Sequence, residues 1–176
     1  MALPLEKEYT IQDIYDLPEG ERAELVDGKL YMMAPPSTNH QRIVADMLYQ
    51  IKSFLESNEG KCEVFPAPFA VFLNETDTTY VEPDLCVICD ERKISKKGCM
   101  GAPDWIAEIV SPASKRMDYY VKLFKYRSAG VKEYWIVDEE KKEVTVYDFA
   151  NDNMEQYAMS EEIAVNLYEG KLNIHF

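Results

Sequence analysis

The chain has 176 residues, 47% of them hydrophobic and 12% aromatic, a composition that excludes a disordered chain and predicts a single folded domain over residues 1–176. It has no apolar run near the roughly 20 residues that a membrane span requires. The start, MALPLEKEYTIQD, lacks the regions of a signal peptide, so we expect a cytoplasmic protein with no membrane partner. The formal net charge of −13, taken alone, argues against nucleic acid as a partner.

The first third of the chain predicts a short helix, a hairpin and a long helix. TIQDIYDLPEG is typical of a short capped helix that ends before Pro18. AELVDGKLYMM contains two strand-like runs around Asp27-Gly28, which is a strong hairpin signal. PPSTNHQ then opens a helix with Ser37 as its cap, and this helix ends before Gly60. Its apolar residues recur with a period near 3.6 and are Ile43, Val44, Met47, Leu48, Ile51, Phe54 and Leu55.

The rest of the chain alternates between strands and a further helix. FAVFLNE, DLCVICD and DWIAEIVS are strand candidates, and EYWIVD and EVTVYDF are two more, joined by the charged turn EEKK. Between these groups we predict a helix from about 115 to 129, closed by Gly130. The C-terminal tail alternates weakly and could add an edge strand. This order predicts an α/β or α+β fold with helices around one mixed sheet. The expected inner stripe of the helix is Met117, Tyr120, Val121, Phe124 and Ser128.

Four cysteines stand at positions 62, 86, 89 and 99. Cys86 and Cys89 have the C-x-x-C spacing that occurs in zinc sites. Both lie within one predicted strand, where an odd spacing places side chains on opposite faces, and no second ligand pair stands at a suitable distance. We therefore expect no zinc site and four reduced thiols, mostly buried.

Two acidic residues lie in or beside apolar runs. Asp84 begins DLCVICD and Glu108 lies inside WIAEIVSP. Burying an isolated carboxylate costs several kcal/mol unless a partner compensates for it. Magnesium is one such partner, because it takes one or two carboxylates and keeps water or substrate phosphate in its other positions. Alternatively, Asp84 caps a turn and Glu108 pairs with a buried lysine or arginine.

The helix that follows carries a polar row. Asp118, Lys122 and Tyr126 stand at i, i+4 and i+8, so they lie on one side of the helix, at the border of its apolar stripe. Lys122 could reach a site on the sheet from there, although an ordinary Asp–Lys helix pair would explain the spacing equally well. The segment from Arg92 to Arg127 has nine basic and three acidic residues, and this charge of +6 indicates either a phosphate-binding surface or chance clustering.

The chain resembles a known family. The pieces that carry the resemblance, in order, are ELVDGKL, PPSTNHQRIV, VEPDLCVI, GAPDWIAEIVSPAS, DYYVKLFKYRSAGVKEYWIVD and VTVY. They are similar to the Uma-two family of bacterial proteins, described as "putative restriction endonucleases", which have the PD-(D/E)XK nuclease-like fold. The resemblance extends from about Tyr9 to Tyr147, and its most specific part is the run from Gly101 to Asp138.

The resemblance implies roles for single residues. It implies that Asp84 is the metal-binding aspartate and Glu108 the acidic residue of the second motif. The lysine that usually follows two positions later is replaced by Val110, and Lys122 matches the helix lysine that this family carries instead. Two further residues, Glu24 and His40, also match positions typical of the family.

Other functions for these residues stay open. Glu24 is either a third acid near the metal or an exposed strand carboxylate. For His40 the alternative is a satisfied core histidine, and for Tyr126 a packing residue with a bonded hydroxyl.

The expected function is metal-dependent hydrolysis of phosphodiester bonds, with DNA as the expected nucleic-acid partner and Mg²⁺ or Mn²⁺ as the cofactor. Asp84, Glu108 and the Ile109 carbonyl would hold the ion, and Lys122 would stabilise charge on the phosphate. Paired strand cuts would favour a homodimer. Two alternatives are a catalytically silent nuclease-fold module that binds a partner or DNA, and an acidic mimic of DNA.

Overall fold

A computed structural model describes residues 7–176 of the chain. Its centre is a mixed six-stranded sheet with the order β11-β10-β9-β8-β5-β3. All neighbouring strands are antiparallel except β8 and β9, which are parallel. The prediction of a mixed sheet flanked by helices is confirmed. The strands are β3 (Glu63–Pro66), β5 (Leu85–Ile88), β8 (Trp105–Ile109), β9 (Glu133–Asp138), β10 (Glu143–Asp148) and β11 (Asn153–Ala158).

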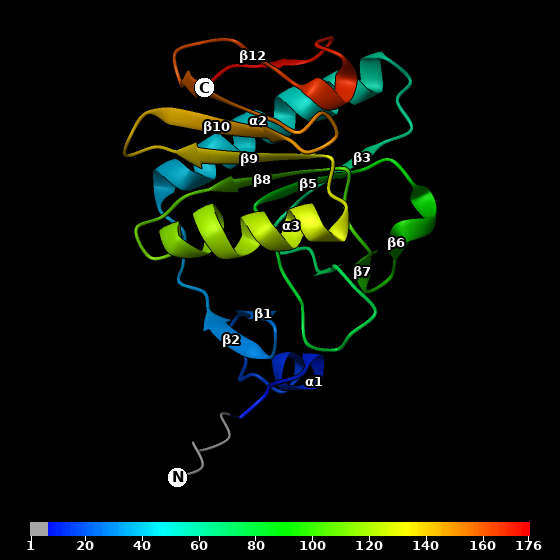
Figure 1. Cartoon of the computed structure of the whole chain (residues 1–176), viewed down its shortest axis with the longest axis vertical. Coiled ribbons are helices and arrows are strands. Elements are labelled where there is room, and N and C mark those ends of the chain that lie inside the picture. The colour runs from blue at the N-terminus through cyan, green and yellow to red at the C-terminus, as the bar shows by residue number, and fades with distance from the viewer. Residues whose placement is uncertain (1–6) are drawn as a thin grey trace.

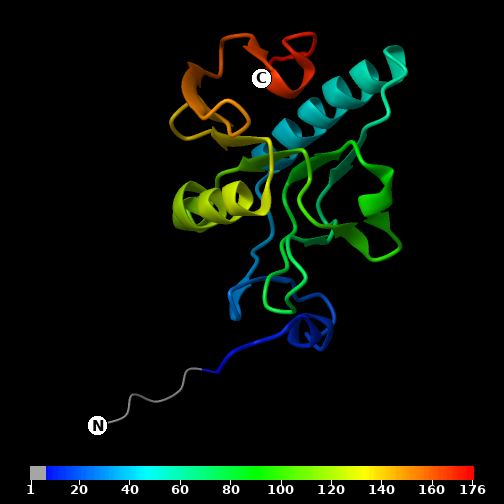
Figure 2. The ribbon, with the colours of Figure 1, turned by 45° about the vertical axis from the view of Figure 1, so that its right-hand side comes forward.

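The parallel pair explains why a helix must follow β8, because parallel neighbours need a long crossover. That crossover is a helix with a π-helical first part, η2 (Met117–Lys122), and an α-helical second part, α3 (Leu123–Ala129). It covers one face of the sheet, whereas α2 (Thr38–Ser57) covers the other (Figures 1 and 2). Gly130 ends the crossover helix in the left-handed conformation, as predicted.

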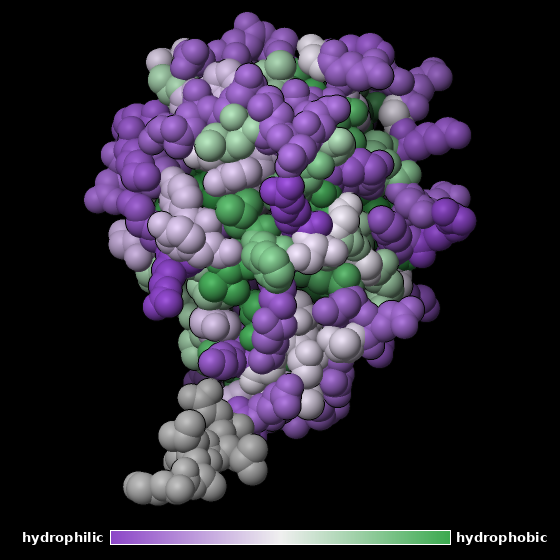
Figure 3. All heavy atoms as spheres, viewed as in Figure 1, coloured by the Kyte–Doolittle hydropathy of each residue, from purple (hydrophilic) through white to green (hydrophobic). Residues whose placement is uncertain are grey.

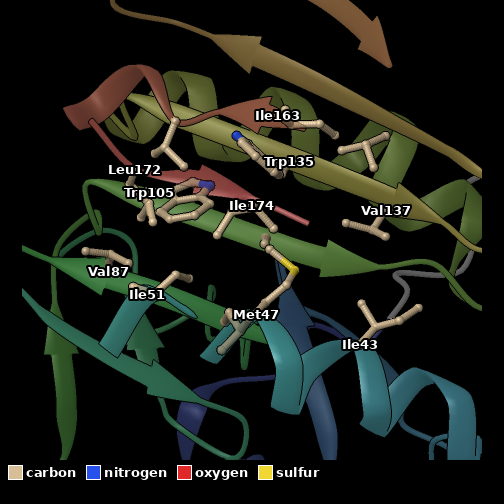
Figure 4. Packing of buried hydrophobic residues seen from close by; sticks show 14 of the residues in the cluster. Ile43, Met47, Ile51, Val87, Trp105, Trp135, Val137, Ile163, Leu172 and Ile174 are labelled. Carbon is tan, nitrogen blue, oxygen red and sulfur yellow. The ribbon is translucent and has the colours of Figure 1, made fainter. Parts of the chain in front are cut away.

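The first core lies between α2 and the sheet. Ser37 caps α2 by accepting a hydrogen bond from the His40 amide, as predicted. Met47, which is fully buried, points from α2 towards the Trp105–Trp135 pair of the sheet (Figure 4). The C-terminal segment closes this core through Ile163, Leu172 and Ile174. Within residues 7–176, no helix combines the length and the apolar character that a membrane span needs.

Alternation along β8 decides which side chains reach the second face. Trp105, Ala107 and Ile109 belong to the core under α2, whereas Ile106 belongs to the core under α3. Because side chains alternate along a strand, Glu108 points to the same face as Ile106, towards the crossover helix. One acidic residue therefore points out of the sheet directly under the helix that carries Lys122.

The N-terminal hairpin extends from the sheet towards the N-terminal end of the molecule (Figure 1). Its strands are β1 (Ala23–Val26) and β2 (Lys29–Met32), as predicted. Asp27 and Gly28 both have positive φ values, 49° and 71°, which a two-residue hairpin turn requires. A short helix, α1 (Ile11–Tyr15), precedes it.

Smaller elements complete the fold. A three-stranded sheet contains β4 (Val71–Phe72), β7 (Gly98–Met100) and β6 (Ile94–Ser95), in that order, and a two-stranded sheet contains β12 (Ile163–Ala164) and β13 (Asn173–Ile174). Two short 3-10 helices are η1 (Glu91–Lys93) and η3 (Asn166–Tyr168). Gly98 in β7 must be glycine, because a Cβ there would lie 2.2 Å from the Ala70 carbonyl oxygen.

Three sequence-based predictions are wrong. FAVFLNE forms only the two-residue β4, which lies outside the central sheet. Tyr120 and Phe124, expected inside, are 72% and 66% exposed. The helix instead buries Asp118 and Lys122, because paired charges can occupy the inner face that apolar residues normally fill.

The third correction concerns the cysteines. Cys62 and Cys89 form a disulfide, against the expectation of four reduced thiols. Glu63 pairs with Ile88 across β3 and β5, so the residues one step further along each strand face each other. Cys86 and Cys99 are free and buried, as expected. Cys86 belongs to the core under α3 and Cys89 packs against the core under α2, so the two do lie on opposite faces.

Asp138, the last residue of β9, fastens the start of the crossover helix and the next turn. Its carboxylate accepts hydrogen bonds from the Tyr119 hydroxyl (3.1 Å) and the Lys141 amide (3.1 Å), and Lys115 lies 3.4 Å away. Burial alone would raise the pKa of Asp138, but these three donors outweigh it, and the pKa lies below its ordinary value. Asp138 thus stabilises the fold above its unfolded pKa, and this contribution disappears as the pH falls through its folded pKa.

Replacing Asp138 with asparagine should lower the free energy of unfolding by about 1–2 kcal/mol at neutral pH, since a charged acceptor is lost. The difference from the wild type should shrink below about pH 4, where the carboxyl group begins to protonate. Urea denaturation at several pH values measures both effects. Asp152→Asn, at an exposed turn, is the matched control and should stay within about 0.5 kcal/mol of the wild type. A pH-independent loss in Asp138→Asn would contradict the ionic explanation.

Candidate active site

A pocket of about 740 Å³ lies between the hairpin, the start of α2, the ends of β5 and β8, and the first turns of the crossover helix. Each of these elements contributes at least one polar side chain. The polar side chains that line it include Arg22, Glu24, His40, Glu82, Asp84, Glu108, Asp118 and Lys122.

Asp84 stands directly before β5 and is held at the pocket by two neighbours. Its Oδ2 accepts a hydrogen bond from the Ile109 amide (2.8 Å) and lies 3.1 Å from His40 Nε2. The Asp84 amide donates to Glu108 Oε2 at 3.4 Å. The two acids predicted from the sequence are therefore adjacent, and Asp84 contacts both the Glu108 carboxylate and the Ile109 amide that follows it.

Glu108 is almost completely buried, with 3% of its surface exposed. Its Oε1 accepts hydrogen bonds from Lys122 Nζ (2.9 Å) and from the Tyr126 hydroxyl (2.6 Å). Glu108 thus has the buried lysine partner that the alternative interpretation expected, and that partner is the predicted site lysine itself. Tyr126 is fully buried with its hydroxyl bonded, as a packing residue would be.

Lys122 lies at the centre of three carboxylates from three different elements. Its Nζ is 2.8 Å from Glu24 Oε2, 2.9 Å from Glu108 Oε1 and 3.5 Å from Asp118 Oδ1. Glu24 comes from β1 and is only 6% exposed, so the interpretation of it as an exposed strand carboxylate is wrong. The lysine therefore joins the hairpin, the sheet and the crossover helix.

The winding of the helix helps Lys122 to reach this position. Residues Met117–Lys122 form a π-helical stretch, which widens the turn and changes the direction of the side chains compared with a regular α-helix. The helix starts behind a tight turn in which the Ser111 and Ser114 side chains bond each other and the backbone. π-Helical turns often occur at functional sites.

The charges in the pocket shift the titration of its groups. Burial raises the pKa of Glu108 well above its ordinary value, and it also raises the pKa of Asp118, although Lys122 opposes both shifts. Burial alone would lower the pKa of Lys122, but Glu108, Glu24 and Asp118 raise it, so its ammonium stays charged. For His40, burial is likewise outweighed by Asp84, and its pKa is raised. Four carboxyl groups thus share one ammonium and a histidine, and the site attracts further positive charge.

Asp118 also lines the pocket, although the sequence predicted it only as one member of a helix pair. It is 2% exposed, and within residues 7–176 its Oδ1 is one of four buried side-chain polar atoms without a hydrogen-bond partner. Lys122 lies at ion-pair distance from this oxygen but without hydrogen-bond geometry. An unsatisfied buried carboxylate oxygen is costly unless a water or an ion meets it.

A second layer, also missed from the sequence, holds Glu24 in place. Glu24 Oε1 accepts a hydrogen bond from the Glu82 amide at 2.9 Å. The Glu82 carboxylate in turn accepts hydrogen bonds from Arg22 and from the Tyr80 hydroxyl. Glu82 stands two positions before Asp84, and this proximity to a predicted site residue was the one signal in the sequence that could have suggested a role for Glu82.

The donor chemistry of the pocket fits a divalent cation of the magnesium type. Within residues 7–176, no three Asp, Glu, His or Cys side chains form a ready-made protein cage for a metal. Magnesium does not need one, because it takes one or two carboxylates and completes its shell with water or phosphate oxygens. The adjacent carboxylates of Asp84 and Glu108, with the Asp118 oxygen that has no hydrogen-bond partner, suit that mode.

The basic segment predicted from the sequence is not one continuous surface. Its side chains bind separate local partners: Arg92 binds Asp90, Lys125 binds Asp27, Arg127 binds Asp152, and Lys93 donates to the Ala102 carbonyl. Only Lys122 lines the main pocket, and Lys115 and Arg116 lie just outside it.

Two known proteins resemble this chain in sequence over most of its length. "Uncharacterized protein sll1609" of Synechocystis sp. is 26% identical over 149 residues, which is 83% of this chain and 81% of that protein. "Uncharacterized protein slr1290" of the same organism is 26% identical over 133 residues, covering 75% and 68%.

A solved structure has the same fold. The crystal structure of "a putative nuclease belonging to DUF820" from Anabaena variabilis superposes with a TM-score of 0.76 and covers 94% of each chain, at 20% identity. The model of the family Uma2, described as "Putative restriction endonuclease", matches residues 9–170. The match covers nearly the whole chain, and the chain therefore belongs to the Uma2 family.

Proposed function

We propose that this chain, as a single domain, is a metal-dependent nuclease that hydrolyses phosphodiester bonds in DNA. The observation that carries the proposal is the convergence of Asp84, Glu108 and Lys122 in one pocket, from β5, β8 and the crossover helix. Membership of the Uma2 family supports the reaction class. Nothing in the pocket geometry selects a base sequence, so recognition would come from a partner or from a second copy in a homodimer.

Asp84 and Glu108 would hold Mg²⁺ or Mn²⁺, with the Ile109 carbonyl as a further ligand. When bound, such an ion lowers the pKa of a coordinated water and polarises the phosphate. Asp84 is kept in place for this by the Ile109 amide and by His40. His40 has a raised pKa next to Asp84 and lies at the pocket, so it is placed to exchange a proton with a leaving group or a water.

Lys122 would stabilise the negative charge that develops on the phosphate. Its ammonium is kept charged by Glu24, Glu108 and Asp118, and Glu24 is itself fixed by the Glu82 amide. The Tyr126 hydroxyl donates a hydrogen bond to Glu108 Oε1 and limits the directions that the carboxylate can take. Glu24, Asp118 and Tyr126 thus hold Lys122 and Glu108 in position before a substrate arrives.

One observation favours a second candidate, a catalytically silent module that binds DNA or a partner. Lys122 is engaged with three carboxylates, and Val110 stands where nucleases of this fold usually carry their lysine. A lysine that only satisfies buried acids would leave the scaffold without a catalytic cation. Metal affinity and cleavage, measured together, separate the two candidates.

The first test is isothermal titration calorimetry of the protein with Mn²⁺. The second test measures cleavage of supercoiled plasmid and of single-stranded circular DNA in the presence of Mg²⁺, Mn²⁺ or EDTA. The nuclease proposal expects saturable Mn²⁺ binding and cleavage that EDTA abolishes. A crystal soaked in Mn²⁺ should show anomalous density between Asp84 and Glu108. If Mn²⁺ binds there but neither DNA is cut, the silent module is favoured. If no Mn²⁺ binds, the metal-dependent mechanism is wrong.

A further inference from the structure

A second, shallower hollow of about 430 Å³ adjoins the active-site pocket. The Pro112–Ala113 turn lines both, so a chain that leaves the pocket over this turn enters the hollow. The hollow is bordered by the start of the crossover helix and by the turn after β9. It has no part in the mechanism given above.

Three basic side chains border the hollow, although the chain as a whole has a net charge of −13. Lys115 is held by Asp138 (3.4 Å) and Glu140 (3.6 Å). The Lys141 ammonium lies over the Tyr119 ring, 4.9 Å from its centroid. Arg116 is exposed, and within residues 7–176 its side chain forms no ion pair. Its guanidinium is thus available for an anionic ligand.

Aromatic rings accompany these charges. Tyr119 and Tyr120 both line the hollow, and Tyr120 is 72% exposed. The apolar side chains that Figure 3 shows where α3 crosses this face lie further along the helix, outside the hollow. An exposed tyrosine beside an arginine suits a ligand that alternates anionic groups with flat rings. Single-stranded nucleic acid has this alternation, because its unpaired bases offer their faces for stacking.

We propose that this hollow is a subsite for an unpaired segment of the nucleic-acid strand, next to the phosphate that the active site would cleave. Arg116 and Lys141 contact phosphates, and Tyr120 stacks on a base. The position of this strand relative to the scissile bond rests on the proposed function, whereas the binding itself does not. A duplex would present only its phosphates here, because its bases are stacked on one another.

The experiment measures binding in EDTA, where no metal-dependent cleavage occurs, by fluorescence anisotropy of a labelled oligothymidylate and of a labelled hairpin duplex. The wild type should bind the oligothymidylate more tightly. Tyr120→Ala should weaken this binding roughly five- to a hundredfold, the range that loss of one stacked base produces. Tyr120→Phe, which keeps the ring, should bind like the wild type. Arg116→Ala should reduce the slope of log affinity against log salt by about 0.7, the value for one phosphate contact on a single strand.

Two exposed positions serve as controls. Phe124→Ala changes an aromatic residue of the same helix that does not line the hollow, and Lys52→Ala removes a cation from α2, on the opposite side of the sheet. Both should bind like the wild type. Circular dichroism checks that every variant is folded.

Three results would overturn the subsite: no binding by the wild type, tighter binding of the duplex, or wild-type affinity in both Tyr120→Ala and Arg116→Ala. Cleavage is measured separately on the same samples. Strand binding that depends on Tyr120, in a protein that cuts no DNA, would support the subsite and reject the nuclease proposal. If Tyr120→Ala and Arg116→Ala bind the strand like the wild type and still cut DNA, the nuclease proposal is supported and the subsite is rejected.

Discussion

Replacing Asp84 with asparagine should reduce metal-dependent DNA cleavage at least about a hundredfold, because even the loss of a residue that merely supports a metal ligand commonly costs ten- to a hundredfold. Asparagine is neutral and a weaker ligand for Mg²⁺, which prefers charged oxygen donors. Its side-chain oxygen can still accept the hydrogen bond from the Ile109 amide, so the fold should remain. Initial rates of plasmid nicking, at saturating and subsaturating Mn²⁺, measure the effect.

The matched control is Asp90→Asn, because Asp90 follows the other end of the same strand and is paired with Arg92 at the surface. It should cleave at the wild-type rate. The far-ultraviolet spectrum and the Tm of Asp84→Asn should match those of the wild type within a few degrees. Wild-type cleavage by a folded Asp84→Asn protein would remove Asp84 from the mechanism and leave only its structural contacts.

Replacing Lys122 with methionine should lower the free energy of unfolding by about 3–5 kcal/mol, the usual cost of removing one partner from a buried ion pair. Methionine fills much of the same space, so the loss would come from the charges of Glu24, Glu108 and Asp118 rather than from a cavity. Cleavage should also disappear, since no other ammonium lines the pocket within residues 7–176. Urea denaturation monitored by circular dichroism gives the stability.

Lys125→Met tests the same change three residues later, where the ammonium pairs with Asp27 at the surface. It should cost less than about 1 kcal/mol, because exposed ion pairs contribute little. If Lys122→Met is as stable as Lys125→Met, the three carboxylates do not depend on Lys122. If Lys122→Met is destabilised but still cuts DNA, Lys122 is a structural residue and not a catalytic one.

The sequence was most informative where a local period or a turn decides the structure. The 3.6-residue period from Ile43 to Leu55 gave α2, and Asp27-Gly28 gave the hairpin, because each signal depends on neighbouring residues only. β3 and β11 were not predicted as central-sheet strands. β11 is exposed at nearly every position, so its sequence shows no buried alternation. Its place at the edge is set by pairing with β10, which local patterning does not encode.

The cysteine and helix errors have a similar cause. Cys62 and Cys89 meet only because Glu63 pairs with Ile88 across two strands, a register that a sequence does not display. The inner face of the crossover helix was assigned by hydrophobicity, which fails where a polar network is buried. Tyr120 and Phe124 were placed inside for that reason, and Asp118 and Lys122 occupy the position instead.

The candidate site was found in part from chemistry and in part from the family resemblance. Buried acids at Asp84 and Glu108 required a compensating partner, which physical reasoning alone could anticipate. Glu24 and His40 entered through the resemblance, because no spacing connects them to β5 or β8. The structure brings both into the pocket, while their roles in a reaction stay predictions. Asp118 was expected only as a helix partner of Lys122, and Glu82 was missed because its contact with Glu24 is distant in sequence.

The hairpin has a consequence for where this protein can be divided. Although β1 and β2 pair only with each other and with a single bridge to Tyr80, Glu24 supplies the shortest of the three contacts to Lys122. A fragment that begins at α2 would contain every strand of the six-stranded sheet but would lack Glu24, one of the three acids around Lys122. Division at that point would thus separate the central sheet from the acid that lies nearest to Lys122.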